Sequence, residues 1–332
     1  MKQENKKINI VYLGGGWPTN IGNAFIDKGS LCSLKLANPN ASIYFASEMP
    51  QWFYYFSNKN YSKALNLVSI IKSDYIVVSG MMLCKEFVKL YESVILQAIK
   101  NGAKFIINGG GGEKYSLEEI SAVRNFLKKC SPLAFISRDE VSFENYQDLA
   151  KYSYNGIDVG FFVSNCCPIA DFSLSNFVVF NFDQSLFQEL FSKNNKTKRE
   201  LKSQISEDCA IINTYHSCWP KTRFRDLFLS LFLANKYIYQ TNTLISDIPE
   251  DYLQLYANAK ATYSNRVHAC IASLSYGKKS RLFSKTKRAL LFDRIGLGNI
   301  QKELVEVDIN KLQKEKNKQI DFLANIFKIN KE

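Results

Sequence analysis

Hydrophobic and polar positions along the chain form short apolar runs that alternate with longer segments of helical periodicity. This alternation is typical of βαβ units, in which parallel strands are covered by helices. In the first half, strands are predicted at 8–13, 41–47, 75–79, 103–108 and 133–137. In the second half, they are predicted at 177–182, 210–215, 236–240, 261–264 and 281–283. The pattern therefore predicts an α/β protein with two Rossmann-like domains.

The alternation is interrupted over residues 164–176, where the sequence SNCCPIADFSLSN is rich in proline, serine and asparagine. Such a stretch is typical of a crossing between domains. We therefore predict an N-terminal Rossmann-like domain at 1–165, a C-terminal Rossmann-like domain at 176–300 and a helical tail at 301–332. Two open sheets in tandem bind ligands in the crevice outside the carboxyl ends of their strands, so functional residues are expected there.

Two helices are marked by local signals. Ser116 and Glu119 have the spacing of a capping box and predict a helix over 117–129. In the tail, one helical face collects Ile320, Leu323, Ile326 and Phe327. We expect this face to pack on the body of the protein, and contact with a membrane surface is the alternative.

The charge balance narrows the range of partners. The 332-residue chain has a formal net charge of +12, which favours anionic partners such as phosphorylated metabolites, nucleotides or an acidic membrane surface. No nucleic-acid-binding motif accompanies the charge, so no nucleic acid is expected among the partners. The eight cysteines include no Cys-x-x-Cys pair, and no metal-ligand cluster is seen. Neither a metal nor another cofactor is therefore expected.

The same features bear on localisation. The N-terminal sequence MKQENKKINIVYLGGG has an apolar run that ends in glycines and lacks a signal-peptide core, and no apolar stretch reaches membrane-spanning length. Cysteines without a disulfide framework suit a reducing compartment. We expect a cytoplasmic protein, with peripheral association at the inner face of the membrane as an alternative.

Histidine is scarce in this chain. Only His216 and His268 are present, which leaves few candidates for proton transfer near neutral pH. His268 follows Arg266 by two residues, at the predicted turn between the strand 261–264 and a helix over 267–276. Helix N-terminal amides favour an anion, and an arginine there can bind phosphate or carboxylate while the imidazole exchanges a proton. The alternative is a histidine that caps the helix or fills a polar niche.

A second strand-to-turn site follows the predicted strand 133–137. Arg138 comes directly after it, and a guanidinium offers the paired planar donors that suit carboxylate or phosphate. The alternative is a salt bridge between Arg138 and Asp139 that fixes the loop. Glycine-rich segments at 14–16 and 109–112 permit close backbone approach to a ligand, but they match neither a Walker motif nor a dinucleotide-binding fingerprint.

The other histidine, His216, ends a predicted strand and is followed within ten residues by the basic residues Lys221, Arg223 and Arg225. A phosphorylated acceptor could lie against this cluster, with Trp219 or Tyr215 stacking on a sugar. His216, Trp219 and Arg223 are therefore candidate acceptor-binding residues. The alternative is a solvated loop before a helix over 226–235.

Taken in order, several motifs resemble those of the polysaccharide pyruvyl transferase family. They are TNIGNAFID, DYIVVSG, AKFIINGGGG, FISRDEVSF, IPEDYLQLYANAKATYSNRVHACIASLSYGK and KTKRALLFDRIGL. Their order and spacing agree over most of the chain. The most specific piece is the Arg-x-His block with its small-residue helix and Tyr-Gly-Lys, and FISRDEVSF is next.

The resemblance implies a GT-B-like fold, in which two Rossmann-like domains face a cleft. It implies a pyruvyltransferase that moves the enolpyruvyl group of phosphoenolpyruvate to sugar hydroxyls. The product would be a pyruvyl ketal on a cell-surface glycan or its precursor, with a nucleotide-, lipid- or polymer-linked acceptor. Carried over by position, Arg138 and Arg266 resemble anion clamps on the donor, and His268 resembles the acid.

Further donor-binding residues follow from the same resemblance. The first motif contributes Asn20 and Gly22. A family lysine falls on Lys287 when counted back from Gly296 and on Arg288 when counted forward from the histidine. Lys287 is the preferred assignment, and Arg288 is the alternative.

The chain departs from the family pattern in three places. Asn23 stands where an aspartate is usual, Ser79-Gly80-Met81 replaces a longer glycine run, and Asp158 is kept without the proline that often follows it. A GT-B glycosyltransferase with a nucleotide-sugar donor is the main alternative function, since it also explains paired α/β domains and basic charge. It explains the Arg266–His268 turn less specifically. A third possible function is that of a noncatalytic anion- or glycan-binding protein.

Overall fold

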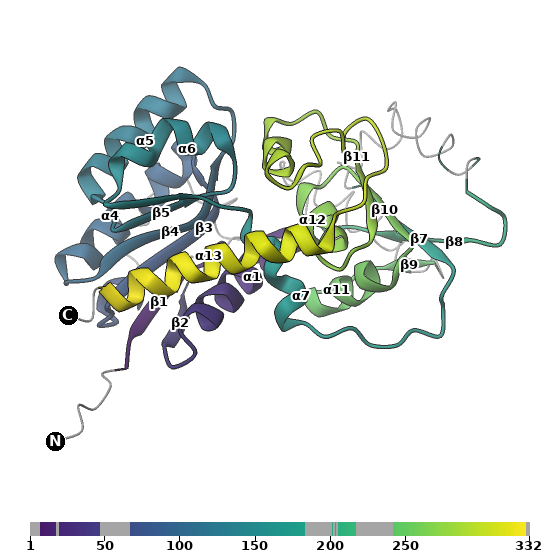
Figure 1. Cartoon of the computed structure of the whole chain (residues 1–332), viewed down its shortest axis with the longest axis horizontal. Helices are drawn as coiled ribbons and strands as arrows, with labels where there is room; N and C mark the ends of the chain where they lie inside the picture. Colours follow the sequence, from purple (N-terminus) through teal and green to yellow (C-terminus); the bar gives the residue numbers. More distant parts are fainter. Residues whose placement is uncertain are drawn as a thin grey trace, which may run out of the picture.

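The computed structural model describes residues 7–17, 20–46, 67–182, 201, 203, 205–216 and 242–329. These residues form two lobes, each built on a parallel β-sheet (Figure 1). The first sheet has the order β2-β1-β3-β4-β5-β6, with the strands β1 (Asn9–Leu13), β2 (Ser42–Ala46), β3 (Tyr75–Leu83), β4 (Lys104–Gly112), β5 (Ala134–Ser137) and β6 (Tyr152–Asn155). The strand order reverses between β1 and β3, which is the arrangement of a doubly wound domain.

The second sheet is also parallel. Its order is β11-β10-β7-β8-β9, with the strands β7 (Phe177–Asn181), β8 (Ala210–Thr214), β9 (Thr243–Leu244), β10 (Ala261–Ser264) and β11 (Lys279–Leu282). Its order reverses between β7 and β10. Parallel sheets require crossover connections, and within the described part of this lobe the helix Val267–Ser275 connects β10 to β11.

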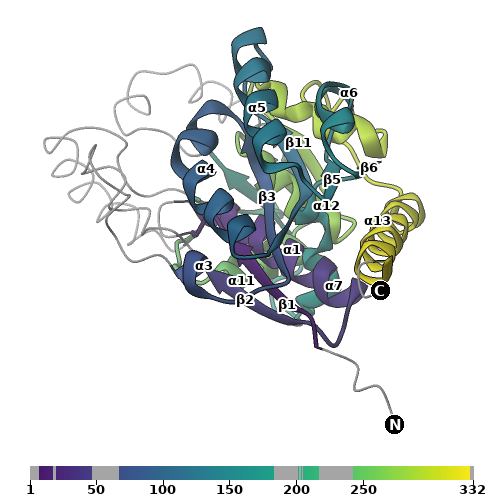
Figure 2. The same cartoon turned by 90° about the vertical axis from the view of Figure 1, so that its left-hand side faces the viewer.

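The helices pack on both faces of the first sheet, and Figure 2 shows α4 and α5 on one side of it and α1 on the other. In the first lobe they are α1 (Ile21–Ala37), α3 (Leu67–Ile70), α4 (Lys85–Lys100), α5 (Leu117–Cys130) and α6 (Glu140–Tyr146), with the 3-10 helices η2 (Gln147–Leu149) and η3 (Val159–Phe162). From the crossing onward they are α7 (Val163–Cys166), α11 (Pro249–Asn258), α12 (Val267–Ser275), the 3-10 helix η4 (Lys287–Ile295) and α13 (Ile309–Ile329).

The α/β prediction with two Rossmann-like domains is confirmed. Nine of the ten predicted strands coincide with observed ones, and the tenth, 236–240, lies outside the described residues, as does the predicted helix 226–235. The short strands β6 and β9 were not predicted. Strands β3 and β4 continue through their glycines, where Gly80 and Gly109 have positive φ and the pairing register shifts.

The capping signal before α5 is used in part as predicted. The Oγ of Ser116 accepts a hydrogen bond from the amide of Glu119 at 3.2 Å. The Oε1 of Glu119 accepts hydrogen bonds from the amides of three preceding residues, Glu113, Lys114 and Tyr115. The carboxylate of Glu119 therefore fixes the loop 113–115, which connects the glycines of β4 to α5.

The C-terminal helix α13 runs from the second lobe back to the first (Figure 1). Leu323, Ile326 and Phe327 are buried on it, in a core shared with Ile10 and Tyr75. Near its middle, Gln319 accepts a hydrogen bond from the amide of Ile157 and donates one to Asn108. This helix thus holds the first sheet and the start of the crossing together. Within the described residues, no helix is both long and apolar enough to cross a membrane.

Candidate active site

The carboxyl ends of strands from both sheets bring charged residues together between the lobes. Arg138 directly follows β5, and Asp158 lies between β6 and η3. His268 is in the first turn of α12, after β10, and Arg288 is in η4, after β11. We call Arg138, Asp158, His268 and Arg288 the charged cluster. Its members lie up to 150 residues apart in the sequence, from Arg138 to Arg288, and meet because parallel strands end at a common edge.

A buried ion pair forms one side of the charged cluster. The Nη1 of Arg138 donates to Oδ2 of Asp158 at 2.9 Å, and both side chains are fully buried. The other carboxylate oxygen of Asp158 accepts a hydrogen bond from the amide of Gly160 at 2.8 Å. Burial alone would raise the pKa of Asp158, but His268 and Arg138 outweigh it and hold that pKa well below its usual value. Asp158 is therefore a carboxylate at neutral pH.

Arg138 is not paired with its neighbour Asp139, the alternative considered from the sequence. The carboxylate of Asp139 caps α6 through the amide of Ser142 and accepts a hydrogen bond from the hydroxyl of Tyr115. The guanidinium packs on Gly111, where a Cβ atom would lie 2.2 Å from Nε of Arg138. The glycine run in β4 therefore makes room for the arginine. Among the described residues, nothing accepts a hydrogen bond from Nε or Nη2 of Arg138.

His268 lies between opposite charges. Its Nε2 is 3.6 Å from Oδ2 of Asp158, and its Nδ1 is 3.5 Å from Nη2 of Arg288. An arginine can only donate, so Nδ1 must accept, which places the proton of the neutral ring on Nε2, facing Asp158. Burial lowers the pKa of His268, Arg288 and Arg138 lower it further, and Asp158 opposes them. The net result is an imidazole that is neutral near pH 7.

Positive charge exceeds negative charge here. Burial, together with Arg138 and Arg266, lowers the pKa of Arg288 to about 10, which still leaves it protonated at neutral pH. Its Nε has no hydrogen-bond partner among the described residues. Buried polar groups without partners are uncommon and costly, and an anion bound beside His268 would supply acceptors for these N–H groups.

The start of α1 completes this region. Asn20 caps the helix by accepting a hydrogen bond from the amide of Gly22 at 3.1 Å. A Cβ atom at Gly22 would lie 3.3 Å from Nδ1 of His216 and 3.4 Å from Cβ of His268. Asn20 and Gly22 therefore lie against both histidines, and the N-terminal ends of α1 and α12 converge where backbone amides favour an anion.

His216 occupies an apolar setting. It is buried, its Nε2 is 2.6 Å from the hydroxyl of Tyr256, and its ring meets those of Phe25 and Tyr252 edge-on. Burial lowers the pKa of His216, and Arg266 and His268 lower it further. A neutral, enclosed imidazole of this kind supports the start of α1, whose Ile21 amide donates to the carbonyl oxygen of His216.

The glycine-rich loop after β1 lies on a buried carboxylate. Oδ1 of Asp27 accepts hydrogen bonds from the hydroxyl of Tyr12 at 2.9 Å and from the amide of Gly15 at 3.3 Å. Burial raises the pKa of Asp27 to about 6, although these hydrogen bonds oppose the shift. Gly15 lies near Asn23 on α1, so this carboxylate positions backbone close to the helix start.

The family model for polysaccharide pyruvyl transferases matches residues 20–284, which is most of the chain and includes three of the four residues of the charged cluster. The chain belongs to the polysaccharide pyruvyl transferase family. This is a family of transferases. The chain matches none of the curated proteins with which it was compared.

Several solved structures share this architecture, and two of the following three are named as UDP-N-acetylglucosamine 2-epimerases. The S. aureus MnaA–UDP complex has 12% sequence identity and a TM-score of 0.55, covering 96% of this chain and 90% of that one. The Methanocaldococcus jannaschii UDP-GlcNAc 2-epimerase with UDP-GlcNAc and UDP has 13% identity and a TM-score of 0.56, covering 97% and 99%. The Rickettsia bellii UDP-N-acetylglucosamine 2-epimerase has 12% identity and a TM-score of 0.55, covering 97% and 96%. At such low identity the likeness establishes the GT-B fold of this pyruvyl transferase family member.

The predicted family residues divide into three groups. The structure brings Arg138, His268, Asn20 and Gly22 together, and Arg266 is close enough to affect the pKa of both Arg288 and His216. The side chain of Lys287 is exposed, whereas its neighbour Arg288 reaches His268. Trp219 and Arg223 lie outside the described residues.

One residue of the cluster had no role assigned from the sequence. Asp158 was seen as a retained family position, but the strand before it, β6, is polar and was not predicted. A usable signal was the sequence Gly-Ile-Asp followed by Val-Gly, in which an aspartate precedes a short turn. Asp158 caps that turn as η3 begins and pairs with Arg138 at the same time.

Proposed function

We propose that this protein transfers the enolpyruvyl group of phosphoenolpyruvate to hydroxyls of a sugar and closes a pyruvyl ketal, as a step in making a cell-surface glycan. The observation that carries the proposal is the charged cluster: beside a buried, neutral histidine, Arg138 and Arg288 each keep N–H groups that have no acceptor among the described residues. Phosphoenolpyruvate has the matching form, since it is small and carries a phosphate and a carboxylate. Family membership supports the same reaction class.

In this proposal the donor is held by guanidinium groups from both lobes. Arg138 and Arg288 supply the unpaired N–H groups, and Arg266 stands at the start of α12 with the helix amides behind it. Charge-assisted, paired hydrogen bonds of this kind are strong and fix orientation. We assign Arg288, in place of Lys287, to the donor, because Arg288 lies against His268 and Lys287 is exposed.

His268 is proposed as the general acid. It would protonate the methylene carbon of the enol phosphate, which leaves cationic character at the adjacent carbon, and a sugar hydroxyl would add there with loss of its proton. Loss of phosphate and attack by a second hydroxyl then close the ketal. Burial, Arg288 and Arg138 lower the pKa of His268, and an anionic donor would raise it, so donor binding would favour proton uptake by the acid. Asp158 would stabilise the resulting imidazolium. General acid catalysis contributes about 10²–10⁴ in rate.

The test is mass spectrometry of candidate acceptors incubated with the protein and phosphoenolpyruvate. The acceptors are nucleotide-linked, lipid-linked and polymeric sugars. The expected result is a product heavier by one pyruvyl group, formed by the unmodified protein and absent with His268→Gln. Transfer by His268→Gln at the unmodified rate would remove this residue from the acid role.

A nucleotide-sugar glycosyltransferase is the second candidate, and one observation favours it: two of the similar structures were solved with UDP. Thermal unfolding with each donor separates the two functions. Phosphoenolpyruvate should raise the melting temperature, and Arg138→Ala should abolish that rise. Protection by a UDP- or CDP-sugar and none by phosphoenolpyruvate would favour the glycosyltransferase.

A further inference from the structure

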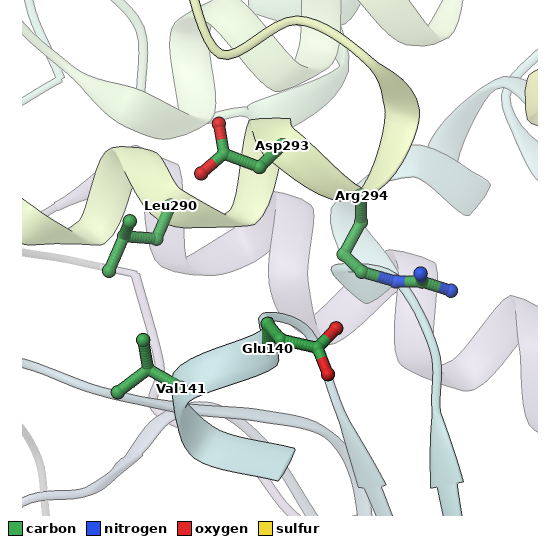
Figure 3. A pocket seen from close by; sticks show the side chains of 5 residues that line it. All are labelled: Glu140, Val141, Leu290, Asp293 and Arg294. Carbon is green, nitrogen blue, oxygen red and sulfur yellow. The ribbon is translucent and has the colours of Figure 1, made fainter. Parts of the chain in front are cut away.

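A pocket of about 150 Å³ lies between α6 of the first lobe and η4 of the second (Figure 3). It is lined by Glu140, Val141, Leu290, Asp293 and Arg294. We call it the α6–η4 pocket. Both walls continue from the charged cluster, since α6 starts two residues after Arg138 and η4 carries Arg288. The pocket therefore adjoins the proposed donor site at the junction of the lobes.

The lining of the pocket combines apolar side chains with carboxylates. Leu290 on η4 faces Val141 on α6 across the pocket (Figure 3). The guanidinium of Arg294 already donates hydrogen bonds to the carbonyl oxygens of Asn155 and Gly156. The carboxylate of Glu140 already accepts a hydrogen bond from the side chain of Asn155 at 2.5 Å. Among the described residues, none donates a hydrogen bond to the carboxylate of Asp293, which is the acceptor left for a ligand.

The charge of the α6–η4 pocket is opposite to that of the charged cluster. Glu140 and Asp293 contribute carboxylates to its lining. Partial burial raises the pKa of Asp293, and the nearby carboxylate of Asp139 raises it further. The guanidinium of Arg294 is also close to Glu315 of α13, at 3.4 Å. An anion is therefore disfavoured here. An uncharged polyhydroxyl ligand is favoured, because its hydroxyls can donate to a carboxylate while its C–H faces pack on leucine and valine.

The size of the pocket restricts the ligand further. Pockets that enclose whole ligands have volumes of about 300–1,000 Å³, which is larger than the space between α6 and η4. We propose that the α6–η4 pocket is a subsite for one uncharged sugar ring of the acceptor. The assignment rests on the proposed transfer to a sugar. One short helix, η4, then carries Arg288 toward the donor and Asp293 toward the acceptor, so it fixes their separation.

This location differs from the sequence-based expectation, which placed the acceptor at His216, Trp219 and Arg223. His216 is enclosed by aromatic rings and hydrogen-bonded to Tyr256. The α6–η4 pocket is lined by residues of α6 and η4, and α1 contributes none of them.

The experiment uses saturation-transfer NMR of the full-length protein with three probes at millimolar concentration. The probes are methyl β-D-galactopyranoside, methyl β-D-glucopyranoside and methyl N-acetyl-β-D-glucosaminide, each with and without phosphoenolpyruvate. The variants are Asp293→Asn and Leu290→Ala. The matched control is Asp171→Asn, which makes the same change at an exposed residue of the crossing segment. Thermal protection by phosphoenolpyruvate is measured for every variant.

At least one glycoside should bind the unmodified protein and Asp171→Asn equally. Asp293→Asn should weaken that binding about tenfold, as expected for loss of a hydrogen bond to a charged group. Both pocket variants should keep their protection by phosphoenolpyruvate, which shows that they fold. Binding that is unchanged in Asp293→Asn and Leu290→Ala would overturn the subsite, and so would the absence of binding by all three glycosides. If glycosides bind through Asp293 but phosphoenolpyruvate gives no protection, the sugar subsite stands and the donor assignment fails.

Discussion

Replacing Asp158 with asparagine tests whether the buried ion pair in the charged cluster holds the fold. Arg138 and Asp158 are 2.9 Å apart and fully buried. At an effective dielectric constant of about 20, unit charges at that distance attract by about 6 kcal/mol. Desolvation offsets much of this attraction, but removing one partner leaves the other charge buried and uncompensated. We expect Asp158→Asn to lower the free energy of unfolding by about 3–5 kcal/mol.

The chain provides a matched control on its surface. Arg124 and Asp148 form an arginine–aspartate pair at 2.6 Å, but their side chains are 31% and 54% exposed. Water screens such a pair, so Asp148→Asn should cost about 0–1 kcal/mol. Urea unfolding followed by circular dichroism at pH 7.5 measures both variants. If the two differ by less than about 1 kcal/mol, the buried pair does not have the assigned role.

Removing both charges separates stability from binding. The double variant Arg138→Met/Asp158→Leu leaves no uncompensated charge, so it should be more stable than Asp158→Asn alone. It should nevertheless lose protection by phosphoenolpyruvate, because the proposed donor contact of Arg138 is gone. A double variant that is both stable and protected would mean that Arg138 serves the fold only.

Three further predictions concern individual residues. His268→Gln should reduce transfer by about 10²–10⁴, measured as ketal formed on an acceptor, and unmodified turnover would contradict the acid role. Arg288→Ala should weaken phosphoenolpyruvate binding at least about tenfold in calorimetry, whereas the adjacent Lys287→Ala should change it less than about twofold. A larger loss of binding in Lys287→Ala than in Arg288→Ala would return the donor-binding role to Lys287. The pKa of Asp27, about 6, lies above its unfolded value of 3.8, so the ionised carboxylate increasingly destabilises the fold as pH rises toward and through 6. Asp27→Asn should therefore be more favourable at pH 8 than at pH 5, by about 1.5 kcal/mol in urea unfolding, and an equal effect at both values would contradict the shift.

The fold could be read from the sequence where a local pattern determines the element. Apolar runs bounded by glycines and polar residues predicted nine strands, because strands buried on both faces are nearly continuous apolar runs. The strand β6 was missed because its sequence, YSYN, contains no apolar run. Its residues are half-buried at the edge of the sheet. An edge strand needs less apolar surface, so periodicity gave no signal.

The site could be predicted only in part for a related reason. Arg138, Arg266 and His268 each follow a predicted strand, so topology alone directed attention to them. The partner of Arg138 depends on which strand ends are neighbours in space. β5 and β6 are adjacent in the sheet, which brings Asp158 to Arg138 from 20 residues away and leaves Asp139 to cap α6. Counting along the sequence likewise left Lys287 and Arg288 undecided, because a short 3-10 helix directs them differently.

The way the charged cluster is divided between the lobes explains why it suits an anion. Arg138 and Asp158 are paired within the first lobe, and His268 and Arg288 meet within the second. The contact between these two pairs, from Nε2 of His268 to Oδ2 of Asp158, is the longest of the three at 3.6 Å. Both arginines keep N–H groups that no described residue accepts from. An anion accepting from both would add the hydrogen bonds that neither lobe supplies, and its charge would raise the pKa of the histidine between them. Donor binding and protonation of His268 would then both follow from a single negative charge entering the cluster.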